Sequence, residues 1–148
     1  MTQPLLVIKR QINAPPAAVF SAWSKPELLR EWIFPFQNWT ADGKNVFKVG
    51  GEYSVEFTSM DGSVYSHSGK YVEIIQNAKI VFTWNTSDMT DTLITVELHG
   101  VNGNTEVTLT HEQFPNEEVR NRYHEGWQNC LTHLEEFLKS QKTNQLKA

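Results

Sequence analysis

The sequence is poor in cysteine. Cys130 is the only one, so an intramolecular disulfide and a metal site built on several cysteines are both excluded. Cys130 falls on the apolar side of a predicted helix, where a thiol is expected to be buried and structural. We therefore expect a packed core, rather than a covalent or metal cross-link, to hold the fold together.

The sequence also lacks long apolar runs and blocks of basic residues. No stretch approaches the roughly 20 apolar residues of a membrane-spanning helix, and the N-terminus has no basic segment followed by an apolar one. The 17 acidic and 13 basic residues give a net charge of −4, which disfavours binding to nucleic acid. We expect a cytoplasmic protein with no membrane span and no nucleic-acid partner.

The motifs of several catalytic classes are missing as well. The sequence contains no Gly-x-Ser-x-Gly elbow, no Walker loop and no dinucleotide-binding fingerprint. The pairs His111-Glu112 and His124-Glu125 do not belong to a His-Glu-x-x-His helix, and His124 and His133 are nine residues apart, on opposite flanks of the predicted helix. The sequence therefore predicts no metal site and no cofactor, and it leaves the catalytic residues, if any, unknown.

Large aromatic side chains, by contrast, are plentiful. Five Trp, eight Phe and four Tyr occur in 148 residues, and they can either fill a core or line a cavity. A chain of this length buries about two thirds of its unfolded surface as one domain. We expect a single domain over residues 1–140 and a frayed polar tail over residues 141–148.

The last third of the chain predicts one long amphipathic helix, from about Asn116 to Leu138. Its apolar residues recur at a spacing of 3.6 on one stripe. Asn116 is expected to cap the helix, and Glu117 and Glu118 place negative charge in its first turn. Gly126 costs about 1 kcal/mol in a helix interior, so its place on the stripe suggests that a sheet or a ligand packs too closely there for a β-carbon.

Alternation of polar and apolar residues predicts strands before this helix. The segment Asn38 to Asn45 is expected to be irregular. Two short helices are expected after the first strand, over Ala17 to Trp23 and from Leu28 to Trp32. The expected strands are Leu5 to Ile12, Glu52 to Thr58, Val64 to Ile75, Ile80 to Asn85, Leu93 to Leu98 and Glu106 to His111. Because their connections are short, we expect an α+β fold in which an antiparallel sheet of six or seven strands curls around the terminal helix.

Five segments in this order carry a family resemblance. They are Ala14 to Trp23, Pro26 to Trp32, Val49 to Tyr53, Leu109 to Glu112 and Glu125 to Trp127. The chain resembles the SRPBCC or START-like superfamily of helix-grip folds, which includes the birch-pollen-allergen-like proteins. Within it, the chain is similar to the group related to the C-terminal domain of the activator of the 90-kDa heat-shock protein ATPase. The resemblance implies a deep cavity between sheet and terminal helix, commonly used for hydrophobic small molecules, and it implies no reaction.

The candidate ligand-binding residues are aromatic and histidine side chains expected near that cavity. Trp127 and Tyr123 lie four residues apart on the apolar stripe, where they either fill the core or line a pocket. His67 falls on the same face of its predicted strand as two tyrosines, so either a bulge interrupts the strand or one face carries aromatics with a histidine among them. His111 lies at the end of a mostly apolar strand face. Each histidine is either structural or orients a ligand. The full set is Trp127, Tyr123, His67, His111, Tyr53, Phe57, Phe82, Trp84 and Trp32.

Three functions stay open. We expect a binding protein whose cavity holds a hydrophobic or aromatic small molecule. The second is a cyclase-like or dehydratase-like enzyme of the same fold, with His67, His111 and Glu52 as the acid and base candidates. The third is a regulator similar to the chaperone ATPase activator, with a chaperone as its partner.

Overall fold

The computed structural model consists of one antiparallel sheet, two short helices and one long C-terminal helix. It describes residues 4–147, with side chains through residue 141. The strands are β1 (Leu6–Ile12), β2 (Thr40–Asn45), β3 (Glu52–Thr58), β4 (Val64–Ile75), β5 (Lys79–Thr86), β6 (Met89–Val101) and β7 (Asn104–Glu112). The helices are α1 (Pro16–Ser24), α2 (Pro26–Leu29) and α3 (Glu117–Lys147).

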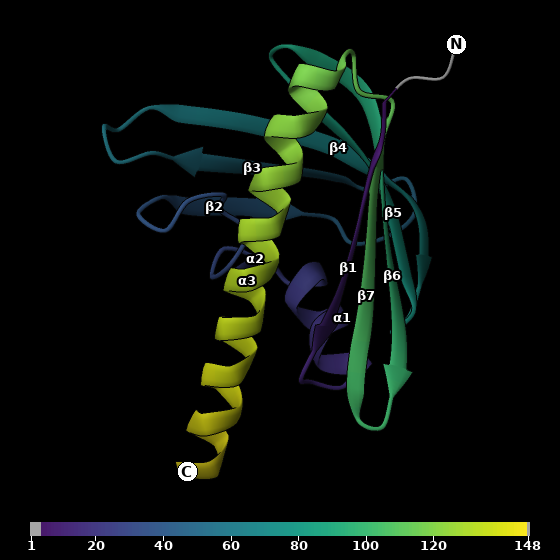
Figure 1. The fold of residues 1–148 in the computed structure, drawn as a ribbon, viewed down its shortest axis with the longest axis vertical. Coiled ribbons are helices and arrows are strands. Elements are labelled where there is room, and N and C mark those ends of the chain that lie inside the picture. The colour runs from purple at the N-terminus through teal and green to yellow at the C-terminus, as the bar shows by residue number, and fades with distance from the viewer. Residues whose placement is uncertain (1–3, 148) are drawn as a thin grey trace.

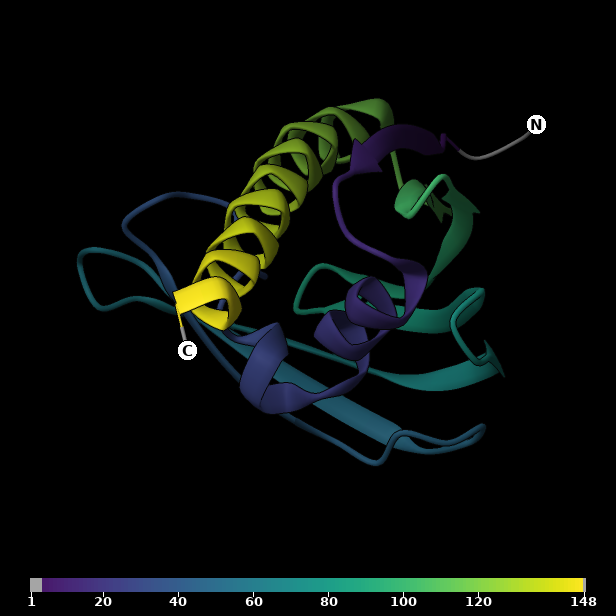
Figure 2. The same cartoon turned by 90° about the horizontal axis from the view of Figure 1, so that it is seen from below.

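The seven strands form a single sheet in the order β1-β7-β6-β5-β4-β3-β2. Each neighbouring pair is antiparallel. The sheet is strongly curved, and α3 lies across its concave side (Figure 1). Seen along α3, helices α1 and α2 lie between α3 and the sheet at one end (Figure 2). This is the helix-grip α+β fold that the sequence predicts.

The strands form where polar and apolar residues alternate. In β3 the side chains of Tyr53, Val55 and Phe57 are buried, and the residues between them are more exposed. The sequence pattern of β4 allowed either a bulge or an aromatic face with a histidine, and β4 has both features. His67 and Tyr71 face inward together, and the register shifts between Tyr71 and Glu73. A period of two matches the geometry of a half-buried strand, so these elements were predictable locally.

Two strands differ from the prediction. The segment expected to be irregular contains β2, whose six residues have no apolar alternation and are exposed or half-buried. Its backbone pairs with β3, from Thr40 opposite Thr58 to Asn45 opposite Tyr53. Strand β6 begins at Met89, four residues before the expected start. In both cases backbone pairing with a neighbouring strand, rather than side-chain pattern, extends the sheet.

Helix α3 begins as the sequence predicts. Asn116 Oδ1 accepts a hydrogen bond of 2.9 Å from the Val119 amide, and Glu117 and Glu118 lie in the first turn. The expected end at Leu138 is wrong, because α3 continues to Lys147. No glycine or proline follows Leu138, so the sequence lacks the two residues that most often mark the end of a helix.

The expectation that Gly126 lies against a close neighbour is also wrong. A β-carbon there would lie 3.5 Å from Pro35 Cβ, which is an ordinary contact. We therefore expect Gly126→Ala to raise the free energy of unfolding by about 1 kcal/mol, because alanine is the better helix former. Urea unfolding followed by tryptophan fluorescence measures the change.

Gly69→Ala is the matched control for this substitution. A β-carbon at Gly69 would collide with the Thr83 carbonyl oxygen of β5, so the same change is expected to destabilise the protein there. A loss of stability in Gly126→Ala would show that Gly126 has a role that packing does not explain.

Candidate ligand site in the core

A small cavity, here called the core void, lies where α1 and α2 meet the concave face of β3, β4 and β5. Its volume is about 20 Å³. It is lined by Trp23, Leu29, Ile33, Tyr53, Val55, Tyr71, Ile80, Phe82 and Trp84. One water needs about 10–15 Å³, whereas a cavity that binds benzene measures roughly 150 Å³. Side chains thus fill most of the space in which the resemblance implies a deep cavity.

The core void brings together three of the nine predicted ligand-binding residues. Tyr53, Phe82 and Trp84 line it. The other six are Trp127, Tyr123, His67, His111, Phe57 and Trp32, and none of them belongs to the lining. Trp32 is fully buried and donates from Nε1 to the Ala22 carbonyl oxygen at 3.1 Å, so it packs behind the void rather than at a cavity mouth.

The structure adds six lining residues that the sequence did not single out. Three of them, Trp23, Leu29 and Ile33, come from α1, α2 and the turn after α2. Trp23 lies on the apolar side of its helix, so periodicity marks it as a core residue. Periodicity does not show which strands this helix packs against, and therefore it does not place Trp23 in a cavity.

His111 is the centre of a buried hydrogen-bond network. Trp127 Nε1 donates to His111 Nδ1 at 3.1 Å, and an indole nitrogen can only donate, so the proton of His111 is on Nε2. Nε2 donates to Thr92 Oγ1 at 2.9 Å, and the Thr92 hydroxyl donates to the Trp84 carbonyl oxygen. Burial lowers the pKa of His111 to about 3. At neutral pH His111 is uncharged with both nitrogens in use, which is a structural arrangement.

His67 lies apart from this network, toward the β3–β4 hairpin. Its Nδ1 is 3.3 Å from the Val55 carbonyl oxygen, and its ring packs between Phe57 and Trp84 at centroid distances of 4.4 and 4.8 Å. Burial lowers the pKa of His67 to about 4. Glu52 is exposed and forms an ion pair of 4.0 Å with Lys70. The acid and base candidates of the enzyme hypothesis are therefore not assembled into one site.

Two buried indole nitrogens, Trp23 Nε1 and Trp84 Nε1, have no hydrogen-bond partner of good geometry among the described residues. Trp84 nevertheless interacts with the side chain of Tyr123. Burial raises the pKa of Tyr123, and interaction with Trp84 opposes that rise. Trp23 Nε1 has no acceptor among the described residues, and Trp23 lines the core void.

A second hollow lies on the surface between α3 and the turn after α2. Its volume is about 320 Å³, and it is open to solvent. Its lining consists of Glu31, Phe34, Gln37, His133, Glu136, Phe137 and Ser140. His133 Nδ1 lies 2.9 Å from the Phe34 carbonyl oxygen, and the rings of His133 and Phe34 pack at a centroid distance of 4.6 Å with a tilt of 31°. The histidine thus holds this turn against the helix.

Among residues 4–147, no three His, Cys, Asp or Glu side chains are placed to hold a metal ion together. Within that range, no helix has the length and apolar character needed to cross a membrane. Cys130 is buried, and burial raises the pKa of its thiol, which fits a structural role.

The curved sheet around α3, with its filled aromatic core, places the protein in the class of helix-grip proteins. The family model described as "Activator of Hsp90 ATPase homolog 1-like protein" matches residues 13–139, and the chain belongs to this family. No curated protein matches the chain. Membership and fold together support a ligand-binding or regulatory role.

Solved structures of bacterial proteins share the fold. A protein of Chromobacterium violaceum is 24% identical, with a TM-score of 0.83 over 88% of this chain and 94% of that one. A protein of Rhizobium leguminosarum is 28% identical, with a TM-score of 0.77 over 93% and 95%. An AHSA1-like protein of Aeromonas hydrophila is 18% identical, with a TM-score of 0.82 over 94% of both chains.

Proposed function

We propose that the chain binds an apolar, ring-containing small molecule at the core void, which widens to admit it. The observation that carries this proposal is the lining of the void, in which aromatic and aliphatic side chains from α1, α2 and three strands surround unfilled space. Ligand sites are typically concave and apolar with few polar groups. The void has this composition and lies between the two short helices and the concave face of the sheet.

Widening requires an element that can move at small cost. Helix α2 has four residues, and it contributes Leu29 to the lining, while Ile33 follows in the next turn. A single short turn of helix has few backbone hydrogen bonds to lose, so segments of this kind open more easily than the strands they cover. We propose that α2 and its following turn shift outward when a ligand enters.

Leu29→Ala tests the proposal by enlarging the void. The substitution is expected to cost about 2–5 kcal/mol of unfolding free energy and to tighten the binding of one-ring compounds such as toluene. A ligand at a hundred times its dissociation constant stabilises the native state by about 2.7 kcal/mol. Thermal melts of wild type and variant, with one-ring and two-ring apolar compounds, measure both effects.

Leu138→Ala is the control, because Leu29 and Leu138 are both 8% exposed and only Leu29 lines the void. Leu138→Ala should lose stability without tighter binding. If no compound shifts the wild-type melt and the two variants respond alike, the void is only a packing defect and the ligand-binding proposal fails.

Regulation of a protein partner is the second candidate. It is supported by the family's name and by a row of aromatic rings near the surface, in which Phe36 contacts Trp39 at 5.0 Å and Trp39 stacks on Tyr65 at 5.3 Å. Phe36 and Tyr65 are 45% and 48% exposed. Exposed apolar patches often mark contacts with other proteins. Failure of the ligand experiment would favour this role, with a chaperone of the 90-kDa heat-shock class as the partner to assay.

A further inference from the structure

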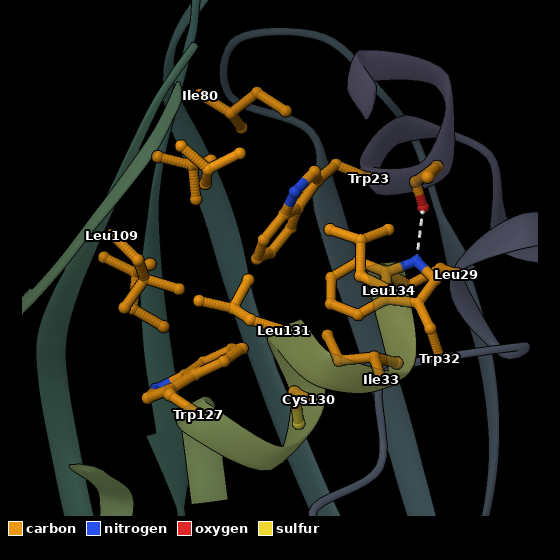
Figure 3. Packing of buried hydrophobic residues seen from close by; sticks show 14 of the residues in the cluster. Trp23, Leu29, Trp32, Ile33, Ile80, Leu109, Trp127, Cys130, Leu131 and Leu134 are labelled. Atoms are coloured by element: carbon orange, nitrogen blue, oxygen red, sulfur yellow. Dashed lines mark hydrogen bonds between the residues drawn. The ribbon is translucent and has the colours of Figure 1, made fainter. Parts of the chain in front are cut away.

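The Trp23 indole N–H is one of two buried indole donors without an acceptor among the described residues, and the other is Trp84. Trp32 and Trp127, which neighbour Trp23, both donate at 3.1 Å, to the Ala22 carbonyl oxygen and to His111 Nδ1. Trp23 is 4% exposed and packs edge-on against Trp32 at 4.6 Å, yet its Nε1 has no acceptor among the described residues. Figure 3 shows the Trp23 ring between Ile80 and Leu131, with its nitrogen on the Ile80 side. Trp23 and Ile80 both line the core void.

We infer that the ligand of the core void carries a neutral hydrogen-bond acceptor of the carbonyl type on an apolar ring system, and that Trp23 Nε1 donates to this acceptor. The inference rests on the proposed function and adds the chemical class of the ligand. A buried polar group is normally paired, and an acceptor brought in by the ligand would pair this one.

The other polar groups of the lining also favour a ligand that carries a hydrogen-bond acceptor. The Tyr71 hydroxyl accepts a 3.0 Å hydrogen bond from Asn45 Nδ2, which leaves its own proton for a further acceptor. The Tyr53 hydroxyl already donates to the Thr83 carbonyl oxygen. No lysine or arginine lines the void, and a buried anion without a counter-charge is strongly disfavoured. The lining therefore suits a neutral ketone or lactone better than a carboxylate.

Trp84 offers a comparison within the same lining. It is 2% exposed, and its Nε1 also has no partner of good geometry. Its side chain, however, interacts with that of Tyr123, and Tyr123 does not line the void. A ligand in the void should therefore meet the N–H of Trp23 and not that of Trp84.

The test compares tetralin with 1-tetralone, which share a ring skeleton and differ by one carbonyl. Dissociation constants are measured for wild type, Trp23→Phe and Trp84→Phe by thermal shift or calorimetry. The ratio of the tetralin constant to the 1-tetralone constant should fall about five- to tenfold in Trp23→Phe, as expected for the loss of one hydrogen bond. It should stay unchanged in Trp84→Phe.

A second measurement needs only the wild-type protein. In ¹⁵N-labelled protein with assigned indole resonances, 1-tetralone should move the Trp23 Nε1–H signal downfield, and tetralin should not. If both compounds bind but the ratio is equal in all three proteins, or another indole moves instead, the inference is overturned and the proposed function stands. If neither compound binds the wild type, both are overturned.

Discussion

Acidification from pH 7 to pH 4.5 is expected to remove several kcal/mol of unfolding free energy, because two histidines are buried uncharged. Burial lowers the pKa of His111 to about 3 and that of His67 to about 4, against about 6.5 in an unfolded chain. Between these values the unfolded state binds more protons than the folded state. Stability therefore rises with pH by about 1.4 kcal/mol per unit for each histidine.

The stabilising contribution is complete above about pH 6.5 and disappears as the pH falls toward the folded-state values. At pH 4.5 the free energy of unfolding is expected to be lower by roughly 2.7 kcal/mol for each histidine. Urea unfolding at half-unit steps between pH 4.5 and 7.5 gives the slope directly.

Two variants distinguish the contribution of His111 to this pH dependence from the contributions of other acid-titrating groups. Gln can accept from Trp127 and donate to Thr92, so His111→Gln should keep much of the network and flatten the pH dependence. His99 is exposed, and His99→Gln should leave the slope unchanged. An unaltered slope in His111→Gln would mean that His111 titrates near its ordinary pKa and is not held neutral by the core.

Trp127→Ala is expected to cost about 3–5 kcal/mol of unfolding free energy. Trp127 is 3% exposed and contacts the rings of Trp84 at 5.4 Å and Trp23 at 6.1 Å. The substitution removes this packing and also leaves His111 Nδ1 without its donor. Trp127→Phe keeps most of the ring volume and loses only the N–H, so it should cost less, about 1–3 kcal/mol for one unpaired buried acceptor.

Trp39→Ala is the control for this series, since Trp39 is half-buried and stacks on Tyr65 near the surface. Its loss of stability should be clearly smaller than that of Trp127→Ala. The alternative interpretation of Trp127, as a pocket residue, gives the opposite result. It requires Trp127→Ala to stay within about 1 kcal/mol of wild type and to change the preference among bound ligands.

The regular elements were predictable because their burial repeats with their own geometry. Strand β3 alternates buried and more exposed positions. The apolar stripe of α3 contains Leu131 and Leu134, both fully buried. The start of α3 was also predictable, since the Asn116 cap is a contact between near neighbours. These features depend on residues within one or two turns of each other.

Strand β2 and the true length of α3 were not predictable in this way. The residues of β2 carry no buried alternation, so the segment is a strand only because β3 presents free backbone groups to it. Beyond Leu138 the sequence is mostly polar and contains no glycine or proline. The apolar pattern that marks the rest of α3 therefore does not show where the helix ends.

The candidate site shows the same division most sharply. Periodicity in the sequence predicted a sheet curled around one long helix and the inward direction of His111, because it assigns each side chain to a face. The same pattern left the direction of His67 open. Only the tertiary structure decided that Trp23 and Leu29 meet Tyr53 and Phe82 around a void of about 20 Å³. It also decided that His111 is fully paired while Trp23 Nε1 is not. Packing density and hydrogen-bond pairing depend on side chains from elements far apart in the chain, and no local pattern records how closely those elements approach.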